Sequence, residues 1–277
     1  AVASRPWPVS KRRCGQQLSK RSHAMIVGVG AWRGVGATTT AVAIAAALAG
    51  QGQEPWLVEA DPAGGVLAAR FALAPTAAGT LERLAFPSTR GGGVERFDDA
   101  ARDIGGVRLI TAPGDPFRAW GCHSPRYSWQ TALRELDGPV VVDLGTMRGG
   151  APNSLLLQQL QLVLLVTNAA AVDLVSTLEW ARSLGRPSPD DRGLALDITR
   201  VAVVDAPVAG TKVSRGDAEA ELGERFAGWL PWSPDAIDLL HRGAGFGHKR
   251  LRRHEFSQSA DGLVGRLRTW LPRERAA

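Results

Sequence analysis

Residues 31–38 read "AWRGVGAT" and have the rhythm of a phosphate-binding loop. Small residues such as Gly34 and Gly36 let backbone N–H groups face phosphate oxygens, and the positive end of a following helix adds to the attraction. Thr38 stands where a hydroxyl would bind Mg²⁺, but Ala37 occupies the position of the lysine that neutralises phosphate charge. The residues predicted to line a phosphate site are Gly34, Val35, Gly36, Ala37, Thr38 and Thr39.

This loop lies between a short apolar run and an alanine-rich helical pattern over residues 38–49, which ends at Gly50. Similar runs alternate with helical patterns along the chain, and several are continuously apolar, as strands buried on both faces are. The strands are predicted at residues 26–29, 56–60, 107–111, 140–143, 162–166, 201–204 and 228–230, and further helices at 174–184, 235–240 and 262–271. The alternation predicts a single α/β domain over residues 25–275, with a mostly parallel seven-stranded sheet covered by helices on both faces.

Three segments, "GVGATTTA", "WLVEADPAGG" and "VVVDLG", follow one another in this order. Together they resemble the MinD/ParA group of P-loop NTPases, and the resemblance spans nearly the whole chain from Met25. It implies the P-loop NTPase fold, with ATP and Mg²⁺ as cofactors. The segments "VEADPAGGVLAARF" and "LPWSPD" resemble in particular MinD-like proteins of actinobacteria. That subgroup commonly lacks the loop lysine, as do TadZ/CpaE-type relatives, so the resemblance implies a degenerate Walker A loop.

The resemblance also implies roles for two acids outside the loop. Asp61 lies in a segment that looks like the D-x-D-P motif of the group, where it would hold the water and Mg²⁺ shell. Asp143 matches the Walker B aspartate. The metal site implied by these matches consists of Thr38, Asp61 and Asp143, and both acids are counted among the catalytic residues.

Two loop residues depart from the pattern of the group. Trp32 stands where relatives keep a lysine that reaches across a nucleotide-sandwich dimer, and Arg33 replaces a glycine. Because a guanidinium binds phosphate through two parallel hydrogen bonds, Arg33 is the candidate to replace the lysine and is the third predicted catalytic residue. Asn168 and Pro231 lie where relatives contact or frame the nucleotide base.

Each of these residues also has a purely structural interpretation. The two loop glycines could make only a tight turn between a strand and a helix. Asp61 could be the N-cap of a helix, a position that favours aspartate, and Asp143 could be a turn residue at a strand end. Asn168 could cap the helix that follows it, and Trp32 could be an exposed contact for a partner.

The composition gives broader limits. The sequence contains no run of eighteen apolar residues, and its two cysteines give neither a disulfide framework nor metal-ligand spacing, so a cytoplasmic protein is expected. The net charge of +6 resides in residues 1–24, which carry six of the 33 basic residues and no acid, while the remaining 27 equal the 27 acidic ones. This basic tail is expected to be disordered or a non-native extension upstream of Met25; contact with DNA or acidic lipid is the alternative.

Three functions of different kinds remain open. The first is a positional regulator or scaffold with a degenerate nucleotide site that binds ATP weakly and has little turnover. The second is a working ATPase for chromosome or plasmid partitioning, division-site placement or secretion-system placement, with Arg33 in place of the lysine. The third is an interaction module that binds no nucleotide.

Partner surfaces are predicted at the carboxyl-terminal end of the chain. The densest basic run outside the tail contains Lys249, Arg250, Arg252 and Arg253, which suit non-specific DNA binding. The last helix carries an apolar stripe that fits either packing against the sheet, which is favoured, or a membrane surface. Protein partners and an ATP-dependent homodimer follow from the family resemblance.

Overall fold

The computed structural model describes residues 25–74, 80–86, 93–124, 129–147, 154–184, 198–243 and 248–271. The basic tail at residues 1–24 lies outside these residues. All predicted strands and helices fall within the described chain.

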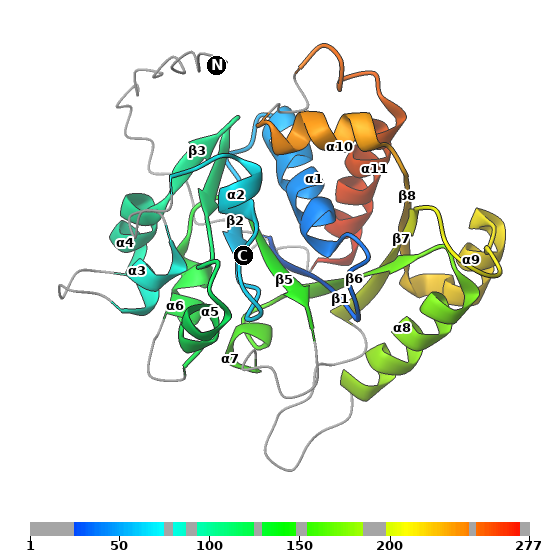
Figure 1. The fold of residues 1–277 in the computed structure, drawn as a ribbon, viewed down its shortest axis with the longest axis horizontal. Coiled ribbons are helices and arrows are strands. Elements are labelled where there is room, and N and C mark those ends of the chain that lie inside the picture. The colour runs from blue at the N-terminus through cyan, green and yellow to red at the C-terminus, as the bar shows by residue number, and fades with distance from the viewer. Residues whose placement is uncertain are drawn as a thin grey trace, which may run out of the picture.

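Eight strands form one sheet in the order β3-β4-β2-β5-β1-β6-β7-β8 (Figure 1). Seven of them are parallel and correspond to the seven predicted strands. The bounds are β1 Ile26–Ala31, β2 Trp56–Glu59, β3 Arg102–Ile104, β4 Val107–Ile110, β5 Val140–Thr146, β6 Leu162–Asn168, β7 Thr199–Asp205 and β8 Phe226–Pro231. The predicted α/β class with a mostly parallel sheet is therefore confirmed.

The predicted count of seven strands is wrong by one, because β3 is an additional edge strand. It has only three residues and pairs antiparallel with β4 across a turn made by Gly105 and Gly106, whose φ angles are 61° and 88°. Two of its three residues are charged, Arg102 and Asp103. An edge strand needs no apolar run, since one of its sides has no neighbouring strand to bury it, and the sequence therefore gave no strand signal here.

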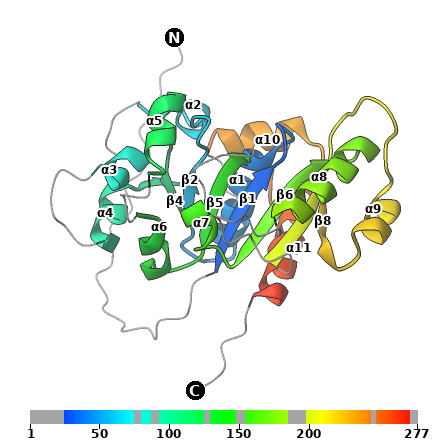
Figure 2. The same ribbon diagram turned by 90° about the horizontal axis from the view of Figure 1, so that it is seen from below.

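One face of the sheet is covered by α1 (Ala37–Gly50), α10 (Pro234–His241) and α11 (Glu255–Trp270), with the short α2 (Leu67–Arg70) beside them. Figures 1 and 2 show α1 and α11 side by side over the sheet, with α10 lying across α1. Helix α1 consists almost wholly of alanine and β-branched or leucine residues, and Ala41, Ile44 and Leu48 are fully buried. Small side chains on every side allow α1 to pack closely against both the sheet and α11.

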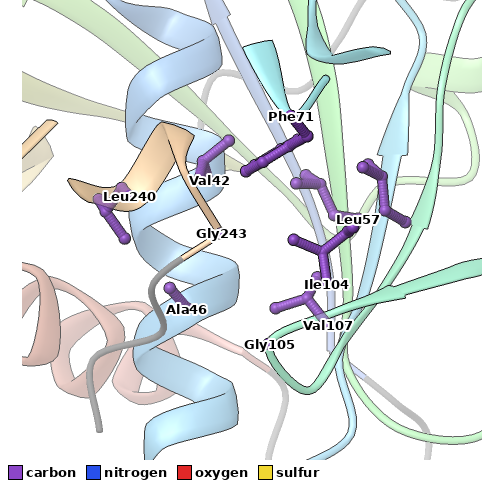
Figure 3. A pocket seen from close by; sticks show the side chains of 10 residues that line it. Val42, Ala46, Leu57, Phe71, Ile104, Gly105, Val107, Leu240 and Gly243 are labelled. Atoms are coloured by element: carbon purple, nitrogen blue, oxygen red, sulfur yellow. The ribbon is translucent and has the colours of Figure 1, made fainter. Parts of the chain in front are cut away.

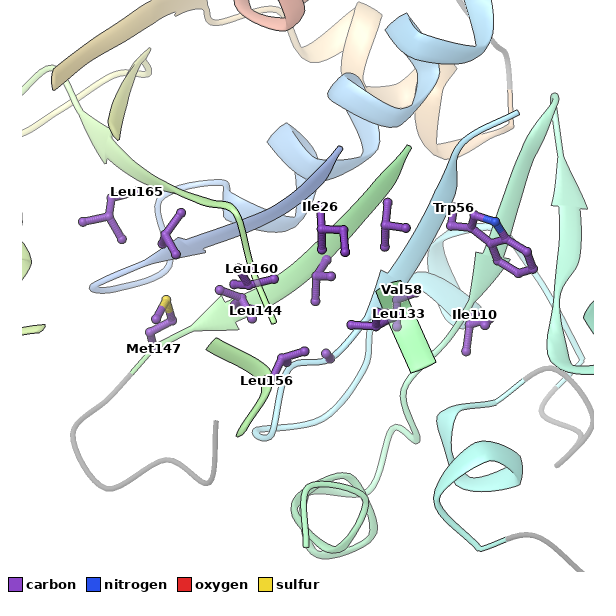
Figure 4. Packing of buried hydrophobic residues seen from close by; sticks show 14 of the residues in the cluster. Ile26, Trp56, Val58, Ile110, Leu133, Leu144, Met147, Leu156, Leu160 and Leu165 are labelled. Atoms are coloured by element: carbon purple, nitrogen blue, oxygen red, sulfur yellow. The ribbon is translucent and has the colours of Figure 1, made fainter. Parts of the chain in front are cut away.

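The other face carries the longer connections and their helices. These are α3 (Leu81–Ala85), α4 (Gly93–Ala100), α5 (Pro116–Gly121), α6 (Trp129–Ala132), α7 (Ser154–Leu157), α8 (Ala171–Leu184) and α9 (Arg215–Leu222), with 3₁₀ turns at Leu133–Glu135 and Gly223–Arg225. Figure 4 shows the core on this face, where residues of β1, β2 and β5 such as Ile26, Val58 and Leu144 meet Leu156 of α7. Each parallel strand thus contributes residues to two separate cores, which explains the continuously apolar runs in the sequence.

The last helix, α11, packs against the sheet as predicted. Leu263, Val264 and Leu267 of its apolar stripe are buried, and its contacts are with β8 and α1. The Arg200 guanidinium lies 4.9 Å from the ring centre of the half-buried Trp270. The stripe is therefore not available for a membrane surface. Across the described residues, no helix combines the length and apolarity needed to cross a membrane.

Candidate functional site

The segment after β1 makes a turn that leads directly into helix α1. Gly36 has φ 98° and is the N-cap of α1, a left-handed conformation that suits glycine, and no side chain caps the helix. No residue that the structure describes accepts a hydrogen bond from the N–H groups of Ala37, Thr38 or Thr39. Unpaired N–H groups at the start of a fourteen-residue helix form a site that suits an anion.

Ala37, which the family resemblance places at the position of a lysine, is buried. The residue is 7% exposed and belongs to the core cluster that surrounds α1. Thr38 and Thr39, by contrast, are half-buried at the open side of the first turn. The loop therefore offers hydroxyl and backbone groups to a ligand, but no charge at this position.

The upstream half of the loop, which contains Trp32 and Arg33, packs against helix α8. Arg33 forms an ion pair with Asp173, whose side chain is 8% exposed, and Asp173 Oδ2 also accepts a hydrogen bond from Asn168 Nδ2 at 3.4 Å. The ring of Trp32 lies 6.3 Å from that of Trp180 on the same helix. The charge of Arg33 is therefore compensated within the chain, and the side chain of Asn168 contacts an acid of α8.

Asp143 lies within β5, three residues before its end, and not at a strand-end turn. The register between β1 and β5 shifts directly after it, which marks a bulge at Leu144. Asp143 is fully buried; its Oδ1 accepts a hydrogen bond from the Gly145 N–H at 3.0 Å, while its Oδ2 has no hydrogen-bond partner among the described residues. The bulge thus leaves one carboxylate oxygen of a buried acid unsatisfied.

The pKa of Asp143 is raised to about 7, mainly by burial and then by the neighbouring charges of Glu59 and Asp61. The Gly145 N–H and the hydroxyl of Thr38, which lies beside the carboxylate, act in the opposite direction. The structure therefore brings Thr38 and Asp143 together, as a shared metal site requires. A cation at this point would favour the charged carboxylate.

Asp61 lies next to the same bulge. Its Oδ1 accepts a hydrogen bond from the Ala63 N–H at 2.8 Å, and its carboxylate lies so close to Gly145 that a Cβ at Gly145 would overlap it. Gly145 has φ 59°, so this position requires glycine for both reasons. The alternative of a helix N-cap is wrong for Asp61, because Val66 occupies the N-cap of α2.

Glu59 is a buried acid at this site to which the sequence interpretation assigned no role. Its Oε1 accepts hydrogen bonds from the N–H groups of Val66 and Leu67 at 2.6 and 2.8 Å, and its Oε2 accepts one from Ala112 at 2.9 Å. Burial raises the pKa of Glu59, and these three bonds lower it. The signal available in the sequence was its place as the first acid of the segment that resembles D-x-D-P.

Pro231, predicted at the nucleotide base, is the last residue of β8 at the far edge of the sheet. Strands β6 and β7 separate β8 from β1, so sheet pairing alone does not bring Pro231 to the loop. The following helix begins at Ser233, whose Oγ accepts a hydrogen bond from the Ala236 N–H at 3.4 Å. Helix α10 then lies across α1 (Figure 1), and Leu240 near its end lines a pocket together with Val42 of α1.

These residues fit a phosphate group with Mg²⁺ better than a metal alone. No group of three His, Cys, Asp or Glu side chains in the described ranges could hold a metal ion by itself. The unsatisfied Oδ2 of Asp143 and the Thr38 hydroxyl lie beside the free N–H groups of α1, so a metal here would share phosphate oxygens as ligands. The site therefore combines backbone N–H groups that suit an anion with a buried carboxylate that suits a cation.

Solved structures provide the comparison, since no protein-family model matches the chain and no curated protein matches its sequence. The cell division ATPase MinD of Pyrococcus furiosus has a TM-score of 0.69 and 17% identity, covering 89% of this chain and 99% of that one. A ParA family ATPase from Chlorobium tepidum has a TM-score of 0.64 and 16% identity, covering 88% and 98%.

The septum site-determining protein MinD of Pyrococcus horikoshii, in complex with Mg-ADP, gives a TM-score of 0.66 and 16% identity, covering 87% of this chain and 94% of that one. These identities are low, but the coverage is nearly complete in both directions. The chain therefore has the fold of the MinD and ParA P-loop ATPases.

Proposed function

We propose that this chain is a MinD/ParA-like positional regulator or scaffold, active in the cytoplasm, whose degenerate nucleotide site binds Mg·ATP weakly and turns it over slowly. One observation carries the proposal. Free N–H groups at the start of α1 lie beside a buried aspartate with an unsatisfied oxygen, while the lysine position holds a buried alanine. The anion cradle and the metal-binding carboxylate have been kept, and the phosphate-neutralising charge has been lost.

The expected affinity follows from the missing charge. A hydrogen bond to a charged group contributes about 1.5–3 kcal/mol, so losing the lysine weakens binding by roughly ten- to hundredfold. Turnover suffers more, because lysine and metal both stabilise charge that develops in the transition state. Weak binding with slow turnover is the combination that this site supports.

The residues divide the work as follows. Phosphate oxygens would accept hydrogen bonds from the loop and from the first turn of α1, residues 34–39. Thr38, Asp61 and Asp143 would hold Mg²⁺, which when bound supplies positive charge to the phosphates. Asp143 would then be ionised, since a cation offsets the effect of burial on its pKa. Asn168 and Pro231 remain the proposed contacts of the base.

The test is a titration of the protein with Mg·ATP at concentrations up to several millimolar, together with a measurement of phosphate release. We expect saturable binding in the high micromolar to millimolar range and slow release. The Ala37→Lys variant should bind roughly ten- to hundredfold more tightly. Absence of binding by the wild type, with binding restored by Ala37→Lys, would instead support the nucleotide-free interaction module.

The alternative of a working ATPase depends on Arg33. Its ion pair with Asp173 argues against this role, because that carboxylate already neutralises the guanidinium. Rapid ATP hydrolysis that is abolished by Arg33→Ala would overturn this conclusion and establish the alternative.

Protein partners and an ATP-dependent homodimer belong to the same proposal, and light scattering with and without Mg·ATP tests the dimer. Non-specific DNA is a further proposed partner. Leu251 is buried and anchors a segment whose four cations are exposed: Lys249, Arg250, Arg252 and Arg253. We expect duplex binding that weakens with salt and is reduced when Arg252 and Arg253 are replaced by alanine. Binding that is insensitive to salt would remove DNA from the list of partners.

A further inference from the structure

Arg70 is a second arginine whose side chain lies beside the start of α1. The proposed function gives it no role. It is the last residue of α2, the short helix that follows Asp61. Its Nη1 lies 3.4 Å from the Thr39 Oγ1 and 3.2 Å from the His241 Nε2. The guanidinium is therefore placed beside the first turn of α1, whereas that of Arg33 pairs with Asp173 of α8.

Hydrogen bonds to Glu59 and the apolar packing of Phe71 hold in place the segment that carries Arg70. Glu59 accepts hydrogen bonds from the N–H groups of Val66 and Leu67 and so holds the start of α2. Next to Arg70, the ring of Phe71 points toward Val42 of α1 in an apolar pocket that is also lined by Leu240 (Figure 3). The neighbours of Arg70 and His241 thus pack against the same helix, which brings the two polar side chains together.

Arg70 is exposed, and neither of its two partners carries an opposite charge. Thr39 is neutral, and the pKa of His241 is lowered, first by burial and then by Arg70, so its imidazole is neutral at physiological pH and accepts the hydrogen bond through Nε2. Within the described chain Arg70 forms no ion pair with a carboxylate, whereas Arg33 does. A cation next to the positive end of a helix is unfavourable unless an anion joins them.

A second observation at the same place points to a ligand. Asp143 is fully buried beside Thr38 and has an oxygen without a partner among the described residues. An anionic ligand carrying a cation would satisfy the free N–H groups of α1, the guanidinium of Arg70 and this oxygen together. Mg-bound polyphosphate has that chemistry, and plain nucleosides do not.

We propose that Arg70 contacts the phosphates of the bound nucleotide and supplies from α2 the positive charge that Ala37 cannot, with His241 as the residue that positions its guanidinium. This inference rests on the proposed nucleotide site and specifies its ligand as a polyphosphate. A guanidinium forms charge-assisted, bidentate hydrogen bonds with phosphate, so the exchange of lysine for arginine on another element keeps the chemistry.

The experiment measures the affinity of the full chain for Mg·ATP and for adenosine, in the wild type and in the Ala37→Lys background, where the higher affinity keeps losses measurable. Arg70→Ala should weaken Mg·ATP binding by roughly ten- to hundredfold and leave adenosine binding unchanged. Arg70→Lys should recover part of the loss, because it restores the charge without the fork. His241→Phe should weaken Mg·ATP binding less than Arg70→Ala does.

Arg83→Ala is the matched control, since Arg83 is also a helix arginine with an exposed side chain but pairs with Asp99 on another helix. Equal Mg·ATP affinity of wild type and Arg70→Ala would overturn the inference and leave the proposed function standing. A parallel loss of Mg·ATP and adenosine would also overturn it, since Arg70 would then support the fold of the site. If neither the wild type nor Ala37→Lys binds Mg·ATP, the proposed function fails, and this inference fails with it.

Discussion

Strands β2 and β5 each carry a buried acid, and the two acids differ in the number of hydrogen bonds that they accept. Glu59 and Asp143 are register partners on these neighbouring parallel strands, and both are buried carboxylates. Glu59 accepts three backbone hydrogen bonds, whereas Asp143 accepts one and keeps an oxygen without a described partner. The first acid is satisfied by its own chain, and the second is not.

This difference separates a structural acid from a candidate ligand-binding acid where burial alone could not. A buried charge is costly unless hydrogen bonds or an opposite charge compensate it. Glu59 is compensated and thereby fixes the two segments that begin at Val66 and Ala112. The burial of the Asp143 carboxylate therefore still costs free energy, and a bound cation would remove that cost. The two arginines beside α1 repeat the contrast, since Arg33 is paired and Arg70 is not.

The largest expected effect is that of Glu59→Ala on stability. It leaves three backbone N–H groups without acceptors, each costing about 1–3 kcal/mol, so the free energy of unfolding should fall by about 5 kcal/mol. Urea unfolding measures it. Asp143→Asn without Mg²⁺ is the comparison and should not destabilise the protein, because asparagine buries no charge. Equal losses in the two variants would show that the contrast between the acids is wrong.

The pH dependence of stability tests the unsatisfied acid. The pKa of Asp143 is raised from 3.8 to about 7, so the folded state binds this proton more tightly than the unfolded chain does. The stability from Asp143 is full below pH 3.8 and is lost as the pH rises through about 7, by at most about 4 kcal/mol. Asp143→Asn should remove this loss in urea titrations from pH 4 to 8. An unchanged profile would contradict the assigned shift.

His123, whose ring lies beside the end of β2, should make stability depend on pH in the opposite direction. Its ring is 1% exposed, lies next to the Ala60 backbone and packs 5.9 Å from Trp129, and burial lowers its pKa from 6.5 to about 4. Its contribution is full above pH 6.5 and is lost as the pH falls through about 4, by roughly 3 kcal/mol. His123→Phe should flatten this part of the profile in the same urea titrations. A wild-type profile retained in His123→Phe would refute the assignment.

The smallest effect is expected for Asp173→Ala, which removes the partner of Arg33. The guanidinium side of this ion pair is 51% exposed, so the loss should be about 1 kcal/mol in urea unfolding, well below that of Glu59→Ala. Val172→Ala is a suitable control, because its side chain lies on the same helix and is 63% exposed. A loss as large as that of Glu59→Ala would mean that the upstream half of the loop depends on α8 for its fold.

Much of the fold could be predicted because its signals are local. Continuous apolar runs marked every parallel strand, and the alanine-rich pattern marked α1 to within one residue at each end. The edge strand β3 was missed because three residues with two charges carry no such signal. At the site, the loop and the two acids Asp61 and Asp143 were predicted from the resemblance of three segments to a known family, but Glu59 and Arg70 were given no role.

The sequence by itself determined the order of the elements, the loop between β1 and α1 and the absence of lysine at Ala37. It could not determine which charged side chains would pair with one another in the folded protein. Arg33 and Asp173 lie 140 positions apart and Arg70 and His241 lie 171 apart, and each pair forms only when the helices pack on the sheet. Compensation of a charge depends on distance and burial, and only the tertiary structure sets these. The tertiary structure therefore decided which arginine is paired and which one faces the start of α1 uncompensated.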